Sequence, residues 1–345
     1  MRTIVMADDG IAFDGDALDH GPLGGAETAF ISLAEAFAAR GHRVQVFNRC
    51  SRTMSQNGVL WKPIEGGLPD TADLYIANRG DKLLPLMPLA TARVFWIHNP
   101  ADYLKKWRYV SKLWYTRPTV VFSSNFHVRS FPRWIPVGGK ATIPYGISKP
   151  FIDINPPRTP PAPRAVFTSS PLRSLDWLLK TWATKIWPHA QEAELHVFSG
   201  PETYGEHGKA RFDKMEEILT QARQLSGKGV VLRTPLPKAS LAVELAGFRS
   251  LLYRGDPGET FCLAVGEAQA AGVPSVVQDI GCVAERVIDK VTGFVTHDDS
   301  TFAARSRALL VDDDLWGRQQ EAALKYQRKW GWADAAAAFE QFLSP

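Results

Sequence analysis

Short β-branched segments alternate with helical segments along the whole chain, and this alternation limits the fold more than any other feature. A chain in which strands and helices alternate is typical of parallel sheets covered by helices. We therefore predict an α/β protein built from doubly wound sheets. The predicted strands are residues 3–7, 43–47, 73–77, 93–98 and 119–124 in the first half, and 164–169, 194–199, 230–233, 250–253, 274–278 and 293–296 in the second.

The chain is long enough for two domains, with 345 residues of which 45% are hydrophobic and 22% charged. A proline-rich stretch at 153–163 separates the two groups of strands and is predicted to be a semi-rigid linker. The predicted domains are residues 1–152 and residues 164–325. Ligands of such doubly wound domains bind at the carboxyl ends of the strands, so we expect a ligand in the cleft between the domains.

Several classes of protein are disfavoured by what the sequence lacks. It has no apolar run of about 18 residues and no signal-peptide pattern. Its three cysteines, Cys50, Cys262 and Cys282, lack the spacing of a metal site or a disulfide framework. It also lacks the G-x-G-x-x-G fingerprint of nicotinamide-type cofactors. We therefore expect a cytoplasmic protein with reduced thiols, no metal site and no cofactor.

Two glutamates separated by seven residues, Glu259 and Glu267, flank the predicted start of an alanine-rich helix. At about 1.5 Å per residue, eight helical steps span roughly 12 Å, about the reach of an extended nucleotide diphosphate-sugar. The backbone amides of residues 261–263 open that helix, where the helix dipole favours phosphate. Taken alone, the two carboxylates favour a simpler interpretation, an ordinary loop glutamate and a solvent-facing helical one, and the flanking residues reverse that preference.

The residues around the pair resemble the retaining GT-B glycosyltransferases of the large nucleotide-sugar-dependent family (glycosyltransferase family 4, glycosyl transferases group 1). The family form reads roughly E-G-F-G-L-P-x-L-E-A-x-A-x-G-x-P-V-V, and this chain reads ETFCLAVGEAQAAGVPSVV from Glu259. Thr260, Cys262 and Ala264 stand where the family usually has glycine, glycine and proline. The resemblance implies the GT-B fold, with two Rossmann-like domains facing across a cleft and the C-terminal helix, about 326–345, packing back on the first domain.

The resemblance also implies a donor site on the second domain. Glu259 would contact the donor sugar and Glu267 the ribose hydroxyls. Arg173, in the segment FTSSPLR, takes the usual lysine position and would bind the diphosphate, whereas Thr168 occupies a slot that often holds arginine. A second phosphate cation is therefore needed, and Arg254 is our candidate. The further predicted donor contacts are Gly24, Gly25, Ser170, Leu236, Thr260, Phe261, Cys262 and Leu263.

On the first domain, His98 follows a predicted strand, at the sheet edge where α/β proteins bind ligands. The family has a histidine here near the donor sugar. We expect His98 to orient sugar hydroxyls through its ring or its backbone carbonyl, and not to act as a base. Tyr145 and Gly146 lie in a turn that matches the family's I-P-N-G-V and are weaker candidates for the sugar pocket or acceptor side.

Residues 101–150 carry nine basic residues and one acid, Asp102, although the net charge of the whole chain is only +4. Within this region, the segment 103–117 places Tyr103, Trp107, Val110 and Trp114 at helical spacing among several basic residues. One interpretation is peripheral contact with an anionic membrane at its inner face; the other is a core-facing aromatic stripe. No nucleic-acid motif accompanies the segment.

We conclude from the sequence that the leading hypothesis is a metal-independent, retaining glycosyltransferase. It would move a sugar from a UDP- or GDP-type donor to a hydroxyl of a glycan or lipid-linked acceptor, such as a bacterial cell-surface polysaccharide. The alternatives are a nucleotide-sugar-binding protein without transfer activity and a nucleotide-sugar epimerase on the same fold.

Overall fold

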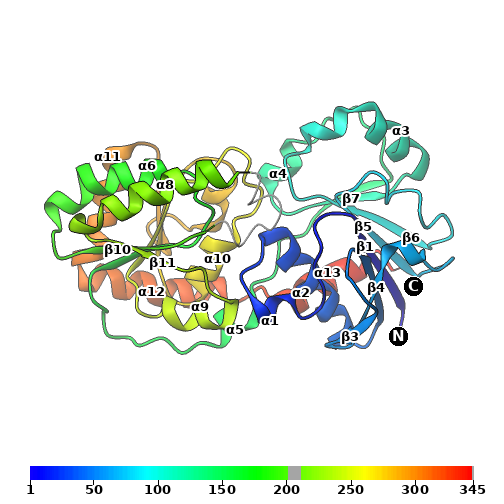
Figure 1. Ribbon diagram of the computed structural model, residues 1–345, viewed down its shortest axis with the longest axis horizontal. Helices are drawn as coiled ribbons and strands as arrows, with labels where there is room; N and C mark the ends of the chain where they lie inside the picture. The colour runs from blue at the N-terminus through cyan, green and yellow to red at the C-terminus, as the bar shows by residue number, and fades with distance from the viewer. Residues whose placement is uncertain (201–210, 344–345) are drawn as a thin grey trace. The chain divides into compact units, whose positions relative to one another are not determined.

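The computed structural model describes residues 1–200 and 211–343. They form two compact α/β units (Figure 1). The first unit contains Met1–His20, Gly25–Gly146 and the C-terminal segment from Trp330. The second contains Gly21–Gly24 and Ile147–Lys329.

The first unit is built on an eight-stranded sheet of order β3-β4-β2-β1-β5-β6-β7-β8. Every neighbouring pair is parallel except β3 and β4, which are antiparallel. The parallel strands point their carboxyl ends to one edge, which positions residues 8, 78 and 98 together. The strands are β1 (Thr3–Asp8), β2 (Arg43–Asn48), β3 (Met54–Gln56), β4 (Val59–Pro63), β5 (Leu74–Asn78), β6 (Ala92–Trp96), β7 (Thr119–Phe122) and β8 (Gly139–Thr142).

The C-terminal helix α13 packs on helix α2 of the same unit. The rings of Phe37 and Phe339 meet edge to face at 6.2 Å. At the end of α13, Glu340 accepts hydrogen bonds from Arg40 at 2.5 Å and from His42 at 2.9 Å. The helices of this unit are α1 (Ala17–His20), α2 (Gly25–Ala39), α3 (Trp107–Thr116), α4 (Asn125–Arg129) and α13 (Trp332–Glu340), with 3-10 helices η1 (Ile64–Gly66) and η2 (Ala101–Lys105).

The second unit is built on a six-stranded, wholly parallel sheet of order β11-β10-β9-β12-β13-β14. Its strands are β9 (Arg164–Phe167), β10 (Glu194–Phe198), β11 (Val230–Arg233), β12 (Ser250–Tyr253), β13 (Ser275–Gln278) and β14 (Gly293–Thr296).

Helices cover both faces of this second sheet, with α6, α8 and α11 on one face and α9, α10 and α12 on the other (Figure 1). The helices are α5 (Lys149–Asp153), α6 (Leu175–Thr181), α8 (Phe212–Gln224), α9 (Lys238–Leu245), α10 (Leu263–Ala270), α11 (Asp299–Val311) and α12 (Asp313–Gln327), with shorter helical segments η3 (Trp182–Ile186), η4 (Trp187–His189), η6 (Ser226–Lys228) and η7 (Val283–Arg286).

The predicted α/β class with doubly wound, parallel sheets is confirmed, and each predicted strand is a strand of the structure. Three strands were not predicted: β3, β4 and β8. They lie at the two ends of the first sheet, where fewer apolar positions are needed and the β signal in the sequence is weak. None of the helices in the described residues is long and apolar enough to cross a membrane.

The prediction of one helical aromatic stripe over 103–115 was wrong. The α-helix begins at Trp107, and Tyr103 lies on the preceding 3-10 helix. The stripe is also divided between two faces, because Val110 is buried whereas Trp107 and Trp114 are 77% and 63% exposed. The buried face of α3 is formed instead by Tyr109, Val110, Leu113 and Thr116.

Candidate functional site

In the second unit, the loops that follow β9 and β12 bring Arg173 and Glu259 together. These strands are parallel neighbours, so their carboxyl ends share one edge of the sheet. Arg173 Nη1 lies 2.9 Å from Asp256 Oδ1 and 3.3 Å from Glu259 Oε2. Both ion pairs involve the same guanidinium nitrogen, and the arginine side chain is 33% exposed. Nη1 of Arg173 is thus held by two carboxylates.

Glu259 is oriented by a second buried partner. The hydroxyl of Tyr253, at the end of β12, donates to Glu259 Oε2 at 2.5 Å. Burial and the nearby Glu259 carboxylate raise the pKa of Tyr253 well above its usual range, so Tyr253 stays a neutral donor. Because Tyr253 and Arg173 both contact Oε2, the carboxylate is fixed in orientation and presents Oε1 as its second acceptor.

The loop around Glu259 needs a glycine at position 281. Gly281 has φ of +68°, and a Cβ there would lie 3.1 Å from the carbonyl oxygen of Glu259. The Cys282 N–H donates to that same carbonyl at 3.2 Å. The backbone turn at 281–282 therefore fixes the main chain of Glu259, as Tyr253 and Arg173 fix its side chain.

Helix α10 begins directly after this loop. Cys262 caps it in the left-handed conformation, with φ of +63°. This geometry explains why glycine is usual at the position, since a side chain is disfavoured there. Thr260, Phe261, Cys262 and Leu263 are all buried, so any ligand at this helix start meets mainly backbone groups.

Glu267 lies on α10 with its side chain only 3% exposed, and Lys238 neutralises it. Lys238 Nζ lies 2.8 Å from both carboxylate oxygens. Burial raises the pKa of Glu267, and the lysine opposes that shift. Glu267, the residue predicted to contact the ribose, thus belongs to a buried ion pair, and the sequence did not reveal its partner Lys238.

The other residues predicted to contact the sugar donor lie elsewhere in the structure. Arg254 donates to Gln278 at 3.1 Å and lies over the ring of Trp177 at 4.9 Å, and its role as a second phosphate cation stays a prediction. The buried Ser170 accepts from the Leu172 N–H at 3.3 Å, and its carbonyl accepts from the Arg173 N–H at 2.9 Å. Leu236 lies between β11 and α9, Gly24 is buried, and Gly25 begins α2.

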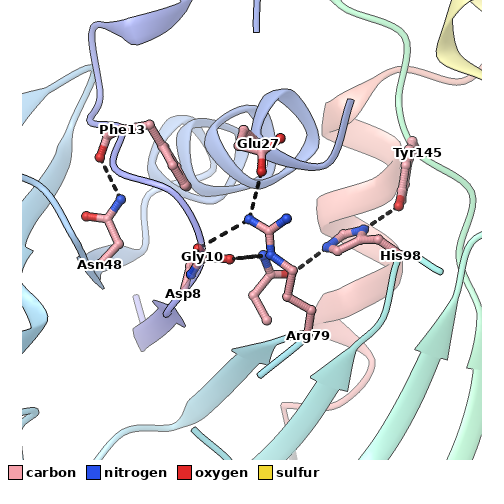
Figure 2. Close-up of polar contacts among 9 residues, drawn as sticks. Asp8, Gly10, Phe13, Glu27, Asn48, Arg79, His98 and Tyr145 are labelled. Carbon is pink, nitrogen blue, oxygen red and sulfur yellow. Dashed lines mark hydrogen bonds and ion pairs between the residues drawn. The ribbon is translucent and has the colours of Figure 1, made fainter. Parts of the chain in front are cut away.

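In the first unit, His98 lies just beyond β6 and belongs to a buried polar network (Figure 2). His98 Nε2 lies 2.5 Å from Asn78 Oδ1, and Nδ1 is hydrogen-bonded to the hydroxyl of Tyr145. Asn78 Nδ2 in turn donates to Asp8 Oδ2 at 2.5 Å. Tyr145 is buried and stacks on Trp332, so it supports the histidine from within the unit.

Arg79 joins this network to the start of α2 (Figure 2). Its guanidinium lies 3.0 Å from Asp8 and 2.8 Å from Glu27. Its backbone is in the left-handed region at φ of +55°, an unusual conformation for an arginine. Gly146, which follows Tyr145, packs so closely on the main chain of Trp332 that a side chain would clash.

Seven residues of these two networks were not predicted as site residues: Asp8, Glu27, Asn78, Arg79, Lys238, Tyr253 and Asp256. A polar residue at a strand end was the available signal for Asn78, Arg79 and Tyr253, and an acid in a Gly-Asp-Pro-Gly loop was the signal for Asp256. Lys238 gave no signal, because its pairing with Glu267 joins positions 29 residues apart. Among the residues that the structure describes, no cluster of histidine, cysteine and acidic side chains has the arrangement of a metal site.

Comparison with known proteins finds a family match in the second half of the chain. Residues 163–312 match the family described as Glycosyl transferases group 1. A D-inositol 3-phosphate glycosyltransferase of Xylanimonas cellulosilytica is 39% identical over 82 residues, which are 23% of this chain and 20% of that protein. The chain thus matches about a fifth of the length of this curated relative.

Solved structures resemble the whole chain. Sucrose-phosphate synthase from Thermosynechococcus elongatus superposes with a TM-score of 0.73 and 16% identity, covering 99% of this chain and 98% of that one. The Anabaena protein HepE, solved in complex with UDP-glucose, has a TM-score of 0.73 and 14% identity, with 99% of both chains covered. At such identities the likeness establishes the fold, which is GT-B.

Proposed function

We propose that this chain transfers a sugar from a nucleotide diphosphate-sugar to an acceptor hydroxyl with retention of configuration, because it has the GT-B fold and its residues 163–312 match the Glycosyl transferases group 1 family. The observation that carries the proposal is the meeting of Arg173, Glu259 and the start of α10 at one sheet edge. That edge offers a cation, a backbone-amide anion site and an oriented carboxylate in one place.

Each of the three groups has a distinct part in the proposed reaction. The guanidinium of Arg173 and the amides that open α10 bind the diphosphate and stabilise the charge that develops as it leaves. Oε1 of Glu259 accepts hydrogen bonds from donor-sugar hydroxyls, because Oε2 already serves Tyr253 and Arg173. Glu267, held by Lys238, accepts from the ribose.

In this mechanism the bond from the anomeric carbon to the diphosphate oxygen breaks, and a bond to the acceptor oxygen forms on the same face of the sugar. The acceptor hydroxyl passes its proton to the departing phosphate, so no protein base is required. Since Arg173 and the helix amides neutralise the diphosphate, we propose that neither a metal nor another cofactor takes part.

The test replaces the two charged groups separately. Arg173→Ala should lower kcat/KM about 100-fold or more, the usual effect of removing one donor that stabilises developing charge. Glu259→Ala should cause a similar loss in kcat/KM for the donor. Arg164→Ala is the matched control, because Arg164 begins the same strand β9 at the opposite sheet edge. Wild-type turnover in either site variant, with a proven UDP- or GDP-sugar and acceptor, would remove the assignment.

Product analysis separates this proposal from its alternatives. NMR of the product should show the anomeric configuration of the donor, and chelation should leave the rate unchanged. Donor binding without transfer or hydrolysis would instead indicate a nucleotide-sugar-binding protein. Conversion of the donor without an acceptor would indicate an epimerase.

We further propose that α3 brings the protein to an anionic membrane surface carrying a lipid-linked or cell-surface glycan acceptor. Trp107, Trp114 and Tyr115 lie on its exposed face, and Tyr115 is 74% exposed. Lys106 precedes the helix and Arg117 follows it, and α3 itself contains no acidic residue. Exposed tryptophans with flanking cations are suited to the interface of a bilayer. Contact at this surface would place the protein at the cytoplasmic face of the plasma membrane.

Vesicle co-sedimentation tests the membrane proposal. Binding should be strong to vesicles containing phosphatidylglycerol, weak to phosphatidylcholine alone, and reduced by salt. The double substitution Trp107→Ala and Trp114→Ala should abolish it, whereas Tyr326→Ala, an exposed aromatic on α12, should not. Equal sedimentation of the double variant and the wild type would refute this surface.

A further inference from the structure

The hydrogen bonds around His98 determine which of its ring nitrogens carries the proton. Asp8 is a buried carboxylate that also pairs with Arg79, so it only accepts hydrogen bonds. Its contact with Asn78 therefore requires the amide NH2 of Asn78, and this fixes the orientation of the amide. The amide oxygen must then face His98 Nε2, which lies 2.5 Å away.

An amide oxygen accepts hydrogen bonds and cannot donate them, so His98 Nε2 must carry a proton. Nδ1 is bonded to the hydroxyl of Tyr145, which can donate to it. The network is thus satisfied by a neutral imidazole with the proton on Nε2 and the lone pair of Nδ1 directed at Tyr145. Both ring nitrogens of His98 are engaged within the first unit.

The charged and titratable surroundings agree with a neutral ring. Burial lowers the pKa of His98 well below its usual range, and the positive charge of Arg79 lowers it further. The other titratable neighbour that acts on His98 is His127, whose pKa is lowered to about 4, mainly by burial. Asp8 and Glu27 do not offset this effect at His98, because both carboxylates are paired with Arg79.

We propose that Asn78 is a positioning residue which, oriented by Asp8, locks His98 in its neutral Nε2–H form so that its ring serves as neither base nor sugar ligand during transfer. The inference rests on the proposed glycosyl transfer and makes it more specific. The family resemblance implies that His98 contacts the donor sugar, and in this proposal its main-chain carbonyl makes that contact. The acceptor proton must accordingly leave through the donor phosphate.

Tyr145 contributes the second hydrogen bond that fixes the His98 ring. The phenol donates to Nδ1, because the pairing of Nε2–H with the amide oxygen of Asn78 leaves Nδ1 without a proton. The ring centroids of Tyr145 and His98 are 5.7 Å apart, that of Trp96 lies 4.8 Å from the histidine, and the Trp96 and Tyr145 rings also meet at 5.7 Å. These aromatic contacts hold the imidazole plane in the orientation that the two hydrogen bonds require.

The test is ¹⁵N NMR of the full chain labelled at histidine, with His98 assigned by the His98→Gln spectrum. The wild type should show a protonated Nε2 and an unprotonated Nδ1 that do not change between pH 6 and pH 8. Asn78→Leu removes both hydrogen bonds of the amide at similar volume. It should give a mixture of tautomers. It should also lower kcat about tenfold to 100-fold, with a smaller change in the KM for the donor, because an unlocked ring no longer fixes the main-chain carbonyl of His98 that contacts the sugar.

The matched control is Asn48→Leu. Asn48 is another buried amide, at the end of β2, which β1 separates from β5; it is bonded to the carbonyl of Phe13 at 2.7 Å and is remote from the histidine (Figure 2). It should leave the His98 spectrum and kcat unchanged. Tyr145→Phe provides a second variant: it should keep Nε2 protonated while shifting the Nδ1 resonance, because that nitrogen loses its donor.

The spectrum is read without substrate, so it judges the lock independently of whether the protein transfers a sugar. A protonated Nδ1, or a cationic ring at pH 7, would overturn the proposal. So would an Asn78→Leu variant with the tautomer and kcat of the wild type. If the lock is found and no transfer occurs with any donor, the proposed function fails and the assignment of the tautomer stands.

Discussion

The buried pair of Lys238 and Glu267 should respond very differently to loss of one partner or the other. Glu267 is only 3% exposed, whereas Lys238 retains 22% exposure of its side chain. Lys238→Met leaves a carboxylate stranded in the protein interior, which typically costs about 3–5 kcal/mol. Glu267→Gln leaves an ammonium group that water can still reach, and an amide oxygen that accepts one of its hydrogen bonds. This second change should cost about 1 kcal/mol or less.

The pH dependence provides an independent check of the same reasoning. Burial already raises the pKa of Glu267 above its unfolded value, and loss of the lysine should raise it further. A carboxyl group with a raised folded-state pKa binds its proton more readily in the folded chain, so acidification favours folding. The destabilisation caused by Lys238→Met should therefore shrink as the pH falls, by up to about 1.4 kcal/mol per pH unit.

Native-state hydrogen–deuterium exchange of the α10 amides is the suitable assay, because a protein with two units need not unfold in one step. Lys180→Met, on the exposed surface of α6, controls for the substitution and should change the opening free energy by about 0.5 kcal/mol or less. Equal losses for Lys238→Met and Glu267→Gln, or a loss below about 1 kcal/mol for Lys238→Met, would refute the argument from burial.

Three further predictions concern stability. The pKa of His127 is lowered to about 4 by burial, so below about pH 6.5 the unfolded chain binds a proton that the folded chain does not. As the pH falls from about 6.5 to about 4, this group should lower the free energy of unfolding, measured in urea, by about 1.4 kcal/mol per pH unit. His127→Asn should remove this contribution to the pH dependence. Gly281→Ala should destabilise by about 1–3 kcal/mol, measured by thermal unfolding, because of its positive φ and the nearby Glu259 carbonyl. Gly317→Ala, in α12 with open space around its Cα, should instead stabilise by about 0.5–1 kcal/mol. The three predictions would be contradicted, respectively, by an unchanged pH dependence in His127→Asn, by a Gly281→Ala variant as stable as the wild type, and by a Gly317→Ala variant that is less stable than the wild type.

The sheets were predictable from the sequence because buried parallel strands need runs of apolar, β-branched residues that stand out locally. The segment 250–253 is one example: SLLY is short, apolar and followed by a glycine-containing loop. The edge strands β3 and β8, and β4 next to β3, were missed because the ends of a sheet tolerate polar residues such as those of Gly139–Thr142. The division of α3 between a buried and an exposed face required the start of the helix to be known.

The candidate residues were predictable only where they belong to a local sequence pattern, as Arg173 does in FTSSPLR. Glu259, Glu267 and the start of α10 are contiguous, so spacing and resemblance found them together. The partners that set their chemistry come from other loops. Tyr253 and Lys238 are paired with these glutamates by the fold, and no local pattern distinguishes them from ordinary tyrosines and lysines.

The same limit applies to His98. Its place after a strand marked it as a site residue, but its protonation is decided by Asn78 and Tyr145. These residues lie 20 and 47 positions away along the chain. Sequence reasoning could propose that the ring orients a sugar. Only the three-dimensional arrangement shows that both nitrogens have protein partners.

A crystal structure of the protein with its intact nucleotide diphosphate-sugar would test the central claim most directly. The diphosphate should lie within hydrogen-bonding distance of Arg173 and of the amides that open α10, with a sugar hydroxyl on Oε1 of Glu259. A donor bound at any other edge of the second sheet, with Arg173 still paired only to Asp256 and Glu259, would contradict it.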